Sequence, residues 1–88
     1  MRLRVEFTTE PFDLERVPPH AEAARDALRG AALDAVDVGP FGNTAEGGAA
    51  AVLDAVQQVL SASLEAGATR VSLQVSVVGE DGPAGEAP

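Results

Sequence analysis

A short hairpin in the middle of the chain places the strongest constraint on how the sequence can fold. Two short runs, 36–38 and 43–46, are separated by a turn that contains Gly39, Pro40 and Gly42. Pro40 fixes one φ angle and Gly42 tolerates a positive one, so the two runs can pair as antiparallel strands. Because a strand pattern and a helix pattern lie on each side of it, the sequence predicts a nearly symmetric arrangement around this hairpin.

The residues before the hairpin predict a strand and then a helix. Apolar and polar side chains alternate along the first strand, which is typical of a strand with one buried face. Its apolar positions are Leu3, Val5 and Phe7. Pro11 ends this strand, and Pro18-Pro19 suits the first turn of a helix, where a missing N–H costs nothing. The helix expected up to Arg29 has a mostly alanine stripe and therefore buries little apolar area.

The residues after the hairpin predict a second helix and a last strand. Residues 49–66 carry apolar side chains at helical spacing, and Gly67 suits the C-cap of this helix. Residues 70–77 alternate without a fault, and their apolar members are expected in the core. These are Val71, Leu73, Val75 and Val77. Residues 79–88 have too little apolar surface to offset the entropy of ordering, so we expect a folded domain at 1–78 and a disordered acidic Gly/Pro tail.

The order strand, helix, strand, strand, helix, strand predicts an α+β fold of the ferredoxin-like βαββαβ type. Its four-stranded antiparallel sheet would carry both helices on one face. The other face would then carry polar side chains: Arg4, Glu6, Thr8, Ser72, Gln74 and Ser76. Such a face is either open to solvent or covered by a second subunit, which would turn it into a crevice for a small ligand.

Composition excludes several classes of partner. With 88 residues the chain buries only about 60 to 65 % of its unfolded surface, and it has no cysteine for a disulfide or a thiolate metal site. We therefore expect a homo-oligomer. The net charge of -8 argues against nucleic acid. Since no apolar run approaches the ~20 residues that span a bilayer, no membrane contact is expected and a cytoplasmic location is the default.

Catalytic and metal chemistry find little support in the sequence. His20 is the only histidine, and we expect it to be exposed at the start of a helix, without a nucleophile elbow or a second histidine. Glu6 and Glu46 could form a carboxylate pair for acid–base chemistry, but spacing alone does not show whether they meet. We therefore expect a protein that is not an enzyme and has no catalytic residues, metal or cofactor.

Four segments carry a resemblance to a known family. They are 5–8 followed by Pro11, then 38–42, 46–47 and 65–71. In order and spacing these segments resemble the signature segments of the small thiamine-binding proteins of the YkoF-like superfamily. The most specific part is the Gly-Pro-x-x-x-x-x-Glu-Gly element that begins at Gly39.

The resemblance implies a ferredoxin-like subunit that forms dimers or tetramers and binds thiamine, or its hydroxymethylpyrimidine portion, without transforming it. A carboxylate together with a carboxamide or hydroxyl can complement the amino group and ring nitrogens of an aminopyrimidine, and an aromatic side chain can pack against a ring. The ligand-binding residues implied in this way are Glu6, Thr8, Phe41, Asn43, Thr44 and Glu46. The alternative is a structural or regulatory homo-oligomeric interaction module without a small ligand.

Overall fold

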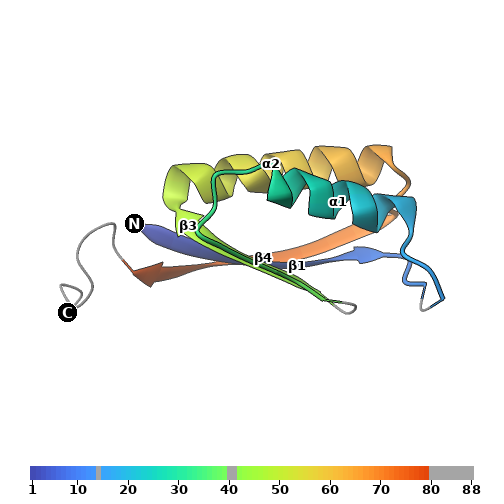
Figure 1. The fold of residues 1–88 in the computed structure, drawn as a ribbon, viewed down its shortest axis with the longest axis horizontal. Coiled ribbons are helices and arrows are strands. Elements are labelled where there is room, and N and C mark those ends of the chain that lie inside the picture. The colour runs from blue at the N-terminus through green and yellow to red at the C-terminus, as the bar shows by residue number, and fades with distance from the viewer. Residues whose placement is uncertain (14, 40–41, 80–88) are drawn as a thin grey trace.

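The computed structural model of the protein describes residues 1–13, 15–39 and 42–79. Its elements are β1 (Arg2–Glu10), α1 (Pro19–Arg29), β2 (Ala35–Val38), β3 (Asn43–Gly48), α2 (Ala49–Glu65) and β4 (Arg70–Gly79). The strands form one antiparallel sheet in the order β2-β3-β1-β4. Both helices form a layer on one face of this sheet (Figure 1). The predicted α+β, ferredoxin-like fold is confirmed, while the tail expected at the end of the chain lies, from residue 80 on, outside the described residues.

The strand register decides which side chains share a face of the sheet. Glu6 lies opposite Thr44 on β3 and opposite Gln74 on β4, and the next residue, Phe7, lies opposite Asn43. Directly paired residues point to the same face, and successive residues point to opposite faces. Glu6, Thr44 and Gln74 therefore lie on the open face of the sheet. Phe7 and Asn43 lie on the face that the helices cover.

The core lies between the helices and the two central strands. Its buried apolar residues are Leu3, Val5, Phe7, Ala24, Leu28, Ala45, Val52, Ala55, Val59 and Ala68. Leu28 is the only large apolar side chain among the residues that α1 buries, the others being His20 and Ala24. A single leucine therefore provides most of the apolar anchoring of this alanine-rich helix.

The apolar row of β4 is less buried than the alternation predicted. The register places Leu73, Val75 and Val77 opposite Phe7, Val5 and Leu3, so these side chains do point to the helical side. All three are nevertheless exposed, and Val77 is 64 % exposed. The reason is that β4 is an edge strand and α2 packs mainly over β1 and β3. The prediction that this row belongs to the core is wrong.

Local signals at the element ends behave mostly as expected. Helix α1 begins at Pro19 and ends before Gly30, as the prolines and the glycine predicted. Strand β3 extends through Gly48, two residues beyond its predicted end, because Gly47 and Gly48 still pair with β1. Neither helix in the described ranges has the length and apolar character that a bilayer-spanning helix needs.

Gly67 supplies a clear test of the turn after α2. Its φ is +108°, and a Cβ added there would meet nothing within 4 Å, so the effect of a substitution is purely conformational. We expect Gly67→Ala to lower the free energy of unfolding by about 1–2 kcal/mol. Gly30→Ala is the matched control, because Gly30 has a φ of -80° and should tolerate alanine without loss. Urea denaturation followed by circular dichroism measures the free energy of unfolding of both variants. Equal losses of stability in the two variants would contradict the left-handed conformation at Gly67.

Candidate functional site

A cavity of about 420 Å³ lies between the first turns of α1, the end of β1 and the β2–β3 hairpin. It exists because the two central strands end at different places. β1 continues to Glu10 alongside β4, whereas its pairing with β3 stops at the Phe7–Asn43 pair. On the β3 side of Thr8 and Thr9, no strand pairs with β1. Helix α1 and the loop that precedes it border the space that is left there.

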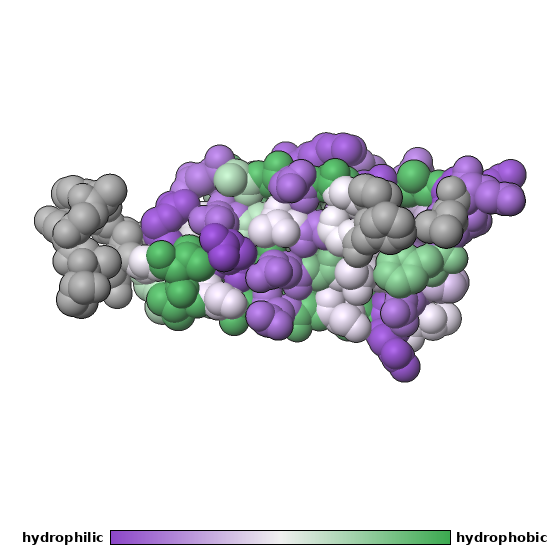
Figure 2. Space-filling model, turned by 90° about the horizontal axis from the view of Figure 1, so that it is seen from below, coloured by the Kyte–Doolittle hydropathy of each residue, from purple (hydrophilic) through white to green (hydrophobic). Residues whose placement is uncertain are grey.

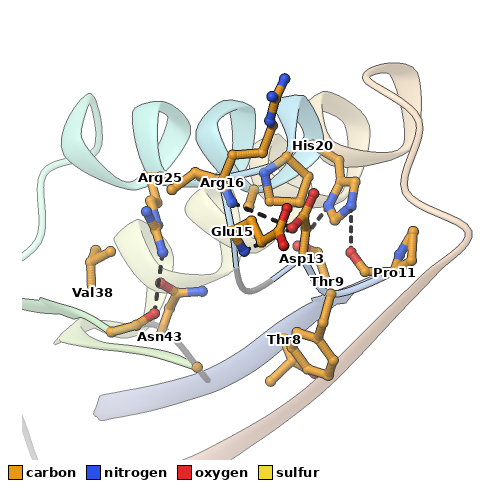
Figure 3. A pocket seen from close by; sticks show the side chains of 16 residues that line it. Thr8, Thr9, Pro11, Asp13, Glu15, Arg16, His20, Arg25, Val38 and Asn43 are labelled. Atoms are coloured by element: carbon orange, nitrogen blue, oxygen red, sulfur yellow. Dashed lines mark hydrogen bonds between the residues drawn. The ribbon is translucent and has the colours of Figure 1, made fainter.

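Two buried polar atoms in the wall of this cavity have no hydrogen-bond partner among the described residues. They are Nε of Arg25 on α1 and Oδ1 of Asn43 at the start of β3. Figure 3 shows Arg25 directed from α1 toward the hairpin that carries Val38 and Asn43. The guanidinium is held there by Nη2, which donates to the carbonyl of Gly39 at 3.2 Å. A buried donor or acceptor without a partner costs about 1–3 kcal/mol, so a ligand that pairs with both atoms would recover that loss.

His20 fastens the first turn of α1 to the end of β1. Its ring is buried, with Nδ1 2.9 Å from Thr9 Oγ1 and Nε2 3.0 Å from the carbonyl oxygen of Pro11. Because a carbonyl only accepts, Nε2 carries the hydrogen, and in the neutral ring Nδ1 accepts from the Thr9 hydroxyl. The prediction that His20 is exposed is wrong, because the loop after β1 folds back and brings the helix start onto the strand end (Figure 3).

Exposed charged side chains form part of the lining of the cavity. Asp13 accepts hydrogen bonds from the backbone N–H groups of Glu15 and Arg16, at 2.9 and 3.3 Å, which shapes the loop before α1. These three side chains are exposed and line the cavity. Two carboxylates and one guanidinium can therefore contact a ligand in the cavity.

Three residues implied by the resemblance come together on the open face of the sheet. Glu6, Thr8 and Thr44 line a second hollow of about 400 Å³, together with Ser72 and Gln74 of β4. Figure 2 shows this face, which is mostly hydrophilic or intermediate in hydropathy across its middle. The hollow is shallow and open, so a ligand there would stay largely in contact with water unless something covered it.

The other implied residues are placed differently. Asn43 borders both hollows, but its Oδ1 is buried in the wall of the cavity beside α1. Glu46 is paired with Arg4, whose Nη2 and Nε lie 2.9 and 3.0 Å from Glu46 Oε2. Phe41 lies outside the described residues. Of the two carboxylates considered for acid–base chemistry, Glu46 is therefore paired with an arginine and does not line the hollow that contains Glu6.

Two residues of the cavity were missed from the sequence. A signal for His20 was present, because it lies in helical phase with Ala24 and Leu28, the buried stripe of α1. For Arg25 the sequence carries no such signal, since no local spacing shows that the hairpin closes beside this residue. In the described part of the chain, no group of three histidine, aspartate or glutamate side chains is close enough to hold a metal ion.

The fold recurs in solved structures. A domain of unknown function, DUF77, from Bacillus cereus is 21% identical, with 90% of this chain and 76% of that chain covered and a TM-score of 0.65. A Streptococcus pneumoniae protein is 18% identical, with coverages of 92% and 90% and a TM-score of 0.67. A putative thiamine biosynthesis/salvage protein from Thermotoga maritima is 23% identical, with coverages of 86% and 81% and a TM-score of 0.61. The chain shares the fold of these proteins. No family model and no curated protein matches its sequence.

Proposed function

We propose that the protein binds thiamine or its hydroxymethylpyrimidine portion, without transforming it, in the cavity between α1 and the β2–β3 hairpin. The observation that carries this proposal is the pair of unpartnered atoms in the wall, an N–H donor on Arg25 and a carbonyl acceptor on Asn43. An aminopyrimidine carries the complementary pair on one edge, because its ring nitrogen accepts and its adjacent amino group donates. The cavity volume of about 420 Å³ lies in the range of small-molecule sites.

The sequence resemblance and one structural neighbour support this ligand class. Asn43 and Gly42 lie within the Gly-Pro-x-x-x-x-x-Glu-Gly element, and both border the cavity. Thr8, which also borders the cavity, lies in the first of the family-like segments. The Thermotoga maritima protein that shares the fold is described as a putative thiamine biosynthesis/salvage protein.

Charge also favours thiamine as the ligand. The thiazolium ring of thiamine is cationic, and the chain has a net charge of -8. Asp13 and Glu15 are exposed carboxylates in the lining of the cavity, and the thiazolium would lie beside them if the pyrimidine ring paired with Arg25 and Asn43. Such exposed charges raise the association rate more than the affinity, and salt screens them.

Calorimetric titration tests the proposal. We expect both thiamine and hydroxymethylpyrimidine to bind with one site per chain, and both to raise the melting temperature. The hydroxyethyl-methylthiazole portion alone is the control ligand, since it lacks the aminopyrimidine edge, and it should bind at least about tenfold more weakly. Absence of heat and of any thermal shift with thiamine and hydroxymethylpyrimidine at millimolar concentration would refute the proposal.

A second candidate function is a homo-oligomeric interaction module without a small ligand. The observation that favours it is the exposed apolar row on β4, which no described element covers. The two functions are compatible, because β4 and the cavity wall on α1 and the hairpin are different parts of the molecule.

A further inference from the structure

We propose that Phe12 and the carboxylates beside it form a subsite for a cationic aromatic ring, which makes the cavity prefer thiamine to its hydroxymethylpyrimidine portion. This inference rests on the proposed function and extends it, because it assigns the residue that selects the second ring of the ligand. It starts from the loop between β1 and α1, whose side chains form a part of the lining that the pairing with Arg25 and Asn43 does not use.

Phe12 is an exposed aromatic side chain in the lining of the cavity. It is 53% exposed, whereas Phe7 is 3% exposed and belongs to the core. Among the residues that the structure describes, no other phenylalanine lines this cavity. Aromatic side chains provide large contact areas and are common in the lining of small-molecule sites. A phenyl ring that is half exposed beside a cavity therefore has apolar surface that a ligand can cover.

Hydrogen bonds on both sides of Phe12 hold it in position. The carbonyl oxygen of Pro11 accepts a hydrogen bond from Nε2 of the buried His20, at 3.0 Å. On the other side, Oδ1 of Asp13 accepts hydrogen bonds from two backbone N–H groups further along the loop, at 2.9 and 3.3 Å. Because both neighbours of Phe12 are fixed before a ligand arrives, binding costs less conformational entropy. His20 is thus a positioning residue for Phe12.

The charges next to Phe12 favour a cation. Asp13 and Glu15 are exposed carboxylates in the lining, and Arg16 supplies one guanidinium. Since the two carboxylates outnumber the guanidinium, this loop has a net negative charge. A cation over the face of a phenyl ring is also attracted by the ring quadrupole, and the attraction is stronger where water is partly excluded. A cationic ring therefore gains more at this place than a neutral ring of the same size.

The two rings of thiamine match two different parts of the lining. The aminopyrimidine edge complements Nε of Arg25 on α1 and Oδ1 of Asn43 on β3. Phe12 and Asp13 belong instead to the loop between β1 and α1. One methylene group joins the two rings of thiamine, and the thiazolium ring carries the positive charge. Hydroxymethylpyrimidine has no second ring, so it would make no contact in the Phe12 subsite.

Isothermal titration calorimetry with both ligands tests the subsite. The wild-type chain should bind thiamine more tightly than hydroxymethylpyrimidine. Phe12→Leu keeps an apolar side chain and removes the aromatic ring, so it should weaken thiamine binding by roughly three- to tenfold and change hydroxymethylpyrimidine binding by less than about twofold. Phe12→Trp should retain thiamine binding, since indole attracts a cation better than a phenyl ring does. Circular dichroism checks that each variant is folded.

Three outcomes of this titration would overturn the proposal. The first is a wild-type chain that binds both ligands equally well. The second is a thiamine affinity that Phe12→Leu leaves unchanged. The third is an equal loss of affinity for both ligands in Phe12→Leu, because Phe12 would then support the cavity as a whole instead of selecting the cationic ring.

Fluorescence gives a second measurement, since the chain has no tryptophan or tyrosine of its own. Thiamine should quench the emission of Phe12→Trp along a saturation curve with the calorimetric dissociation constant, because the electron-poor thiazolium ring would lie against the indole. Leu53→Trp is the matched control, because Leu53 is 55% exposed, against 53% for Phe12, and does not line the cavity. Its emission should show only collisional quenching, without saturation. Equal quenching of the two variants would overturn the subsite.

Failure of the subsite and failure of the proposed function give different results. If the wild-type chain binds hydroxymethylpyrimidine and the Phe12 variants do not respond as expected, the subsite is wrong and the proposed function stands. If the wild-type chain binds neither ligand, both are wrong.

Discussion

We expect Leu28→Ala to lower the free energy of unfolding by about 3 kcal/mol, a large part of the roughly 5–10 kcal/mol that a domain of this size commonly has. Leu28 is 1% exposed, and the other residues that α1 buries are His20 and Ala24. Truncation leaves a void, and no neighbouring large side chain on α1 can compensate for it. The loss should therefore loosen the whole helix from the sheet.

Urea denaturation followed by far-UV circular dichroism measures this loss, and it suits a chain without tryptophan or tyrosine. Leu53→Ala is the matched control, because it removes the same atoms from a leucine that is 55% exposed, and it should change the stability by less than about 0.5 kcal/mol. If Leu28→Ala cost no more than Leu53→Ala, the assignment of Leu28 as the anchor of α1 would be wrong.

The second large effect is expected on ligand binding. Asn43→Leu keeps the approximate shape of the side chain and removes the acceptor Oδ1, so it should weaken hydroxymethylpyrimidine binding by roughly tenfold or more. Arg25→Met keeps the stem and removes the donor Nε, and a charge-assisted hydrogen bond makes its loss larger, roughly 10- to 100-fold. Isothermal titration calorimetry on each variant measures both changes.

The two variants differ in one structural respect. Arg25→Met also removes the hydrogen bond from Nη2 to the Gly39 carbonyl, whereas Asn43→Leu leaves that bond in place. If both variants weaken ligand binding, the cause is therefore loss of contact with the ligand and not a change in the hairpin. Glu6→Gln is the control on the open face, and it should alter the affinity by less than about twofold, within the 0.4 kcal/mol that this factor represents. Binding that responds to Glu6→Gln but not to Arg25→Met would place the ligand on the open face instead.

Much of the fold could be read from local patterns. The alternation in β1 and the helical spacing in α2 each specify a local backbone conformation and a buried side. The chain order of these elements then leaves few ways to bury the apolar sides together. The start of α1 at Pro19 followed from chemistry within one turn of helix.

The candidate site could be predicted only in part. Asn43 and Thr8 were implied by the resemblance, and both border the cavity beside α1. Asn43 and Thr44 were grouped together, but successive residues of a strand point to opposite faces, and the pairing of Asn43 with Phe7 puts its side chain on the helical side. Arg25 could not be found from local spacing, because its contact with Gly39 joins a helix to a hairpin far along the chain.

The sequence by itself determined which side of each element is apolar, where most elements begin and end, and hence the βαββαβ arrangement, because these depend on periodicity and on backbone chemistry within a few residues. Only the tertiary structure decided how completely each apolar side is covered. The positions of α1 and α2 over the sheet bury His20 beneath the loop after β1 but leave Val75 and Val77 of β4 exposed. How completely an apolar side is buried depends on where the helices lie relative to the strands. The pattern of apolar residues along the chain does not specify this position.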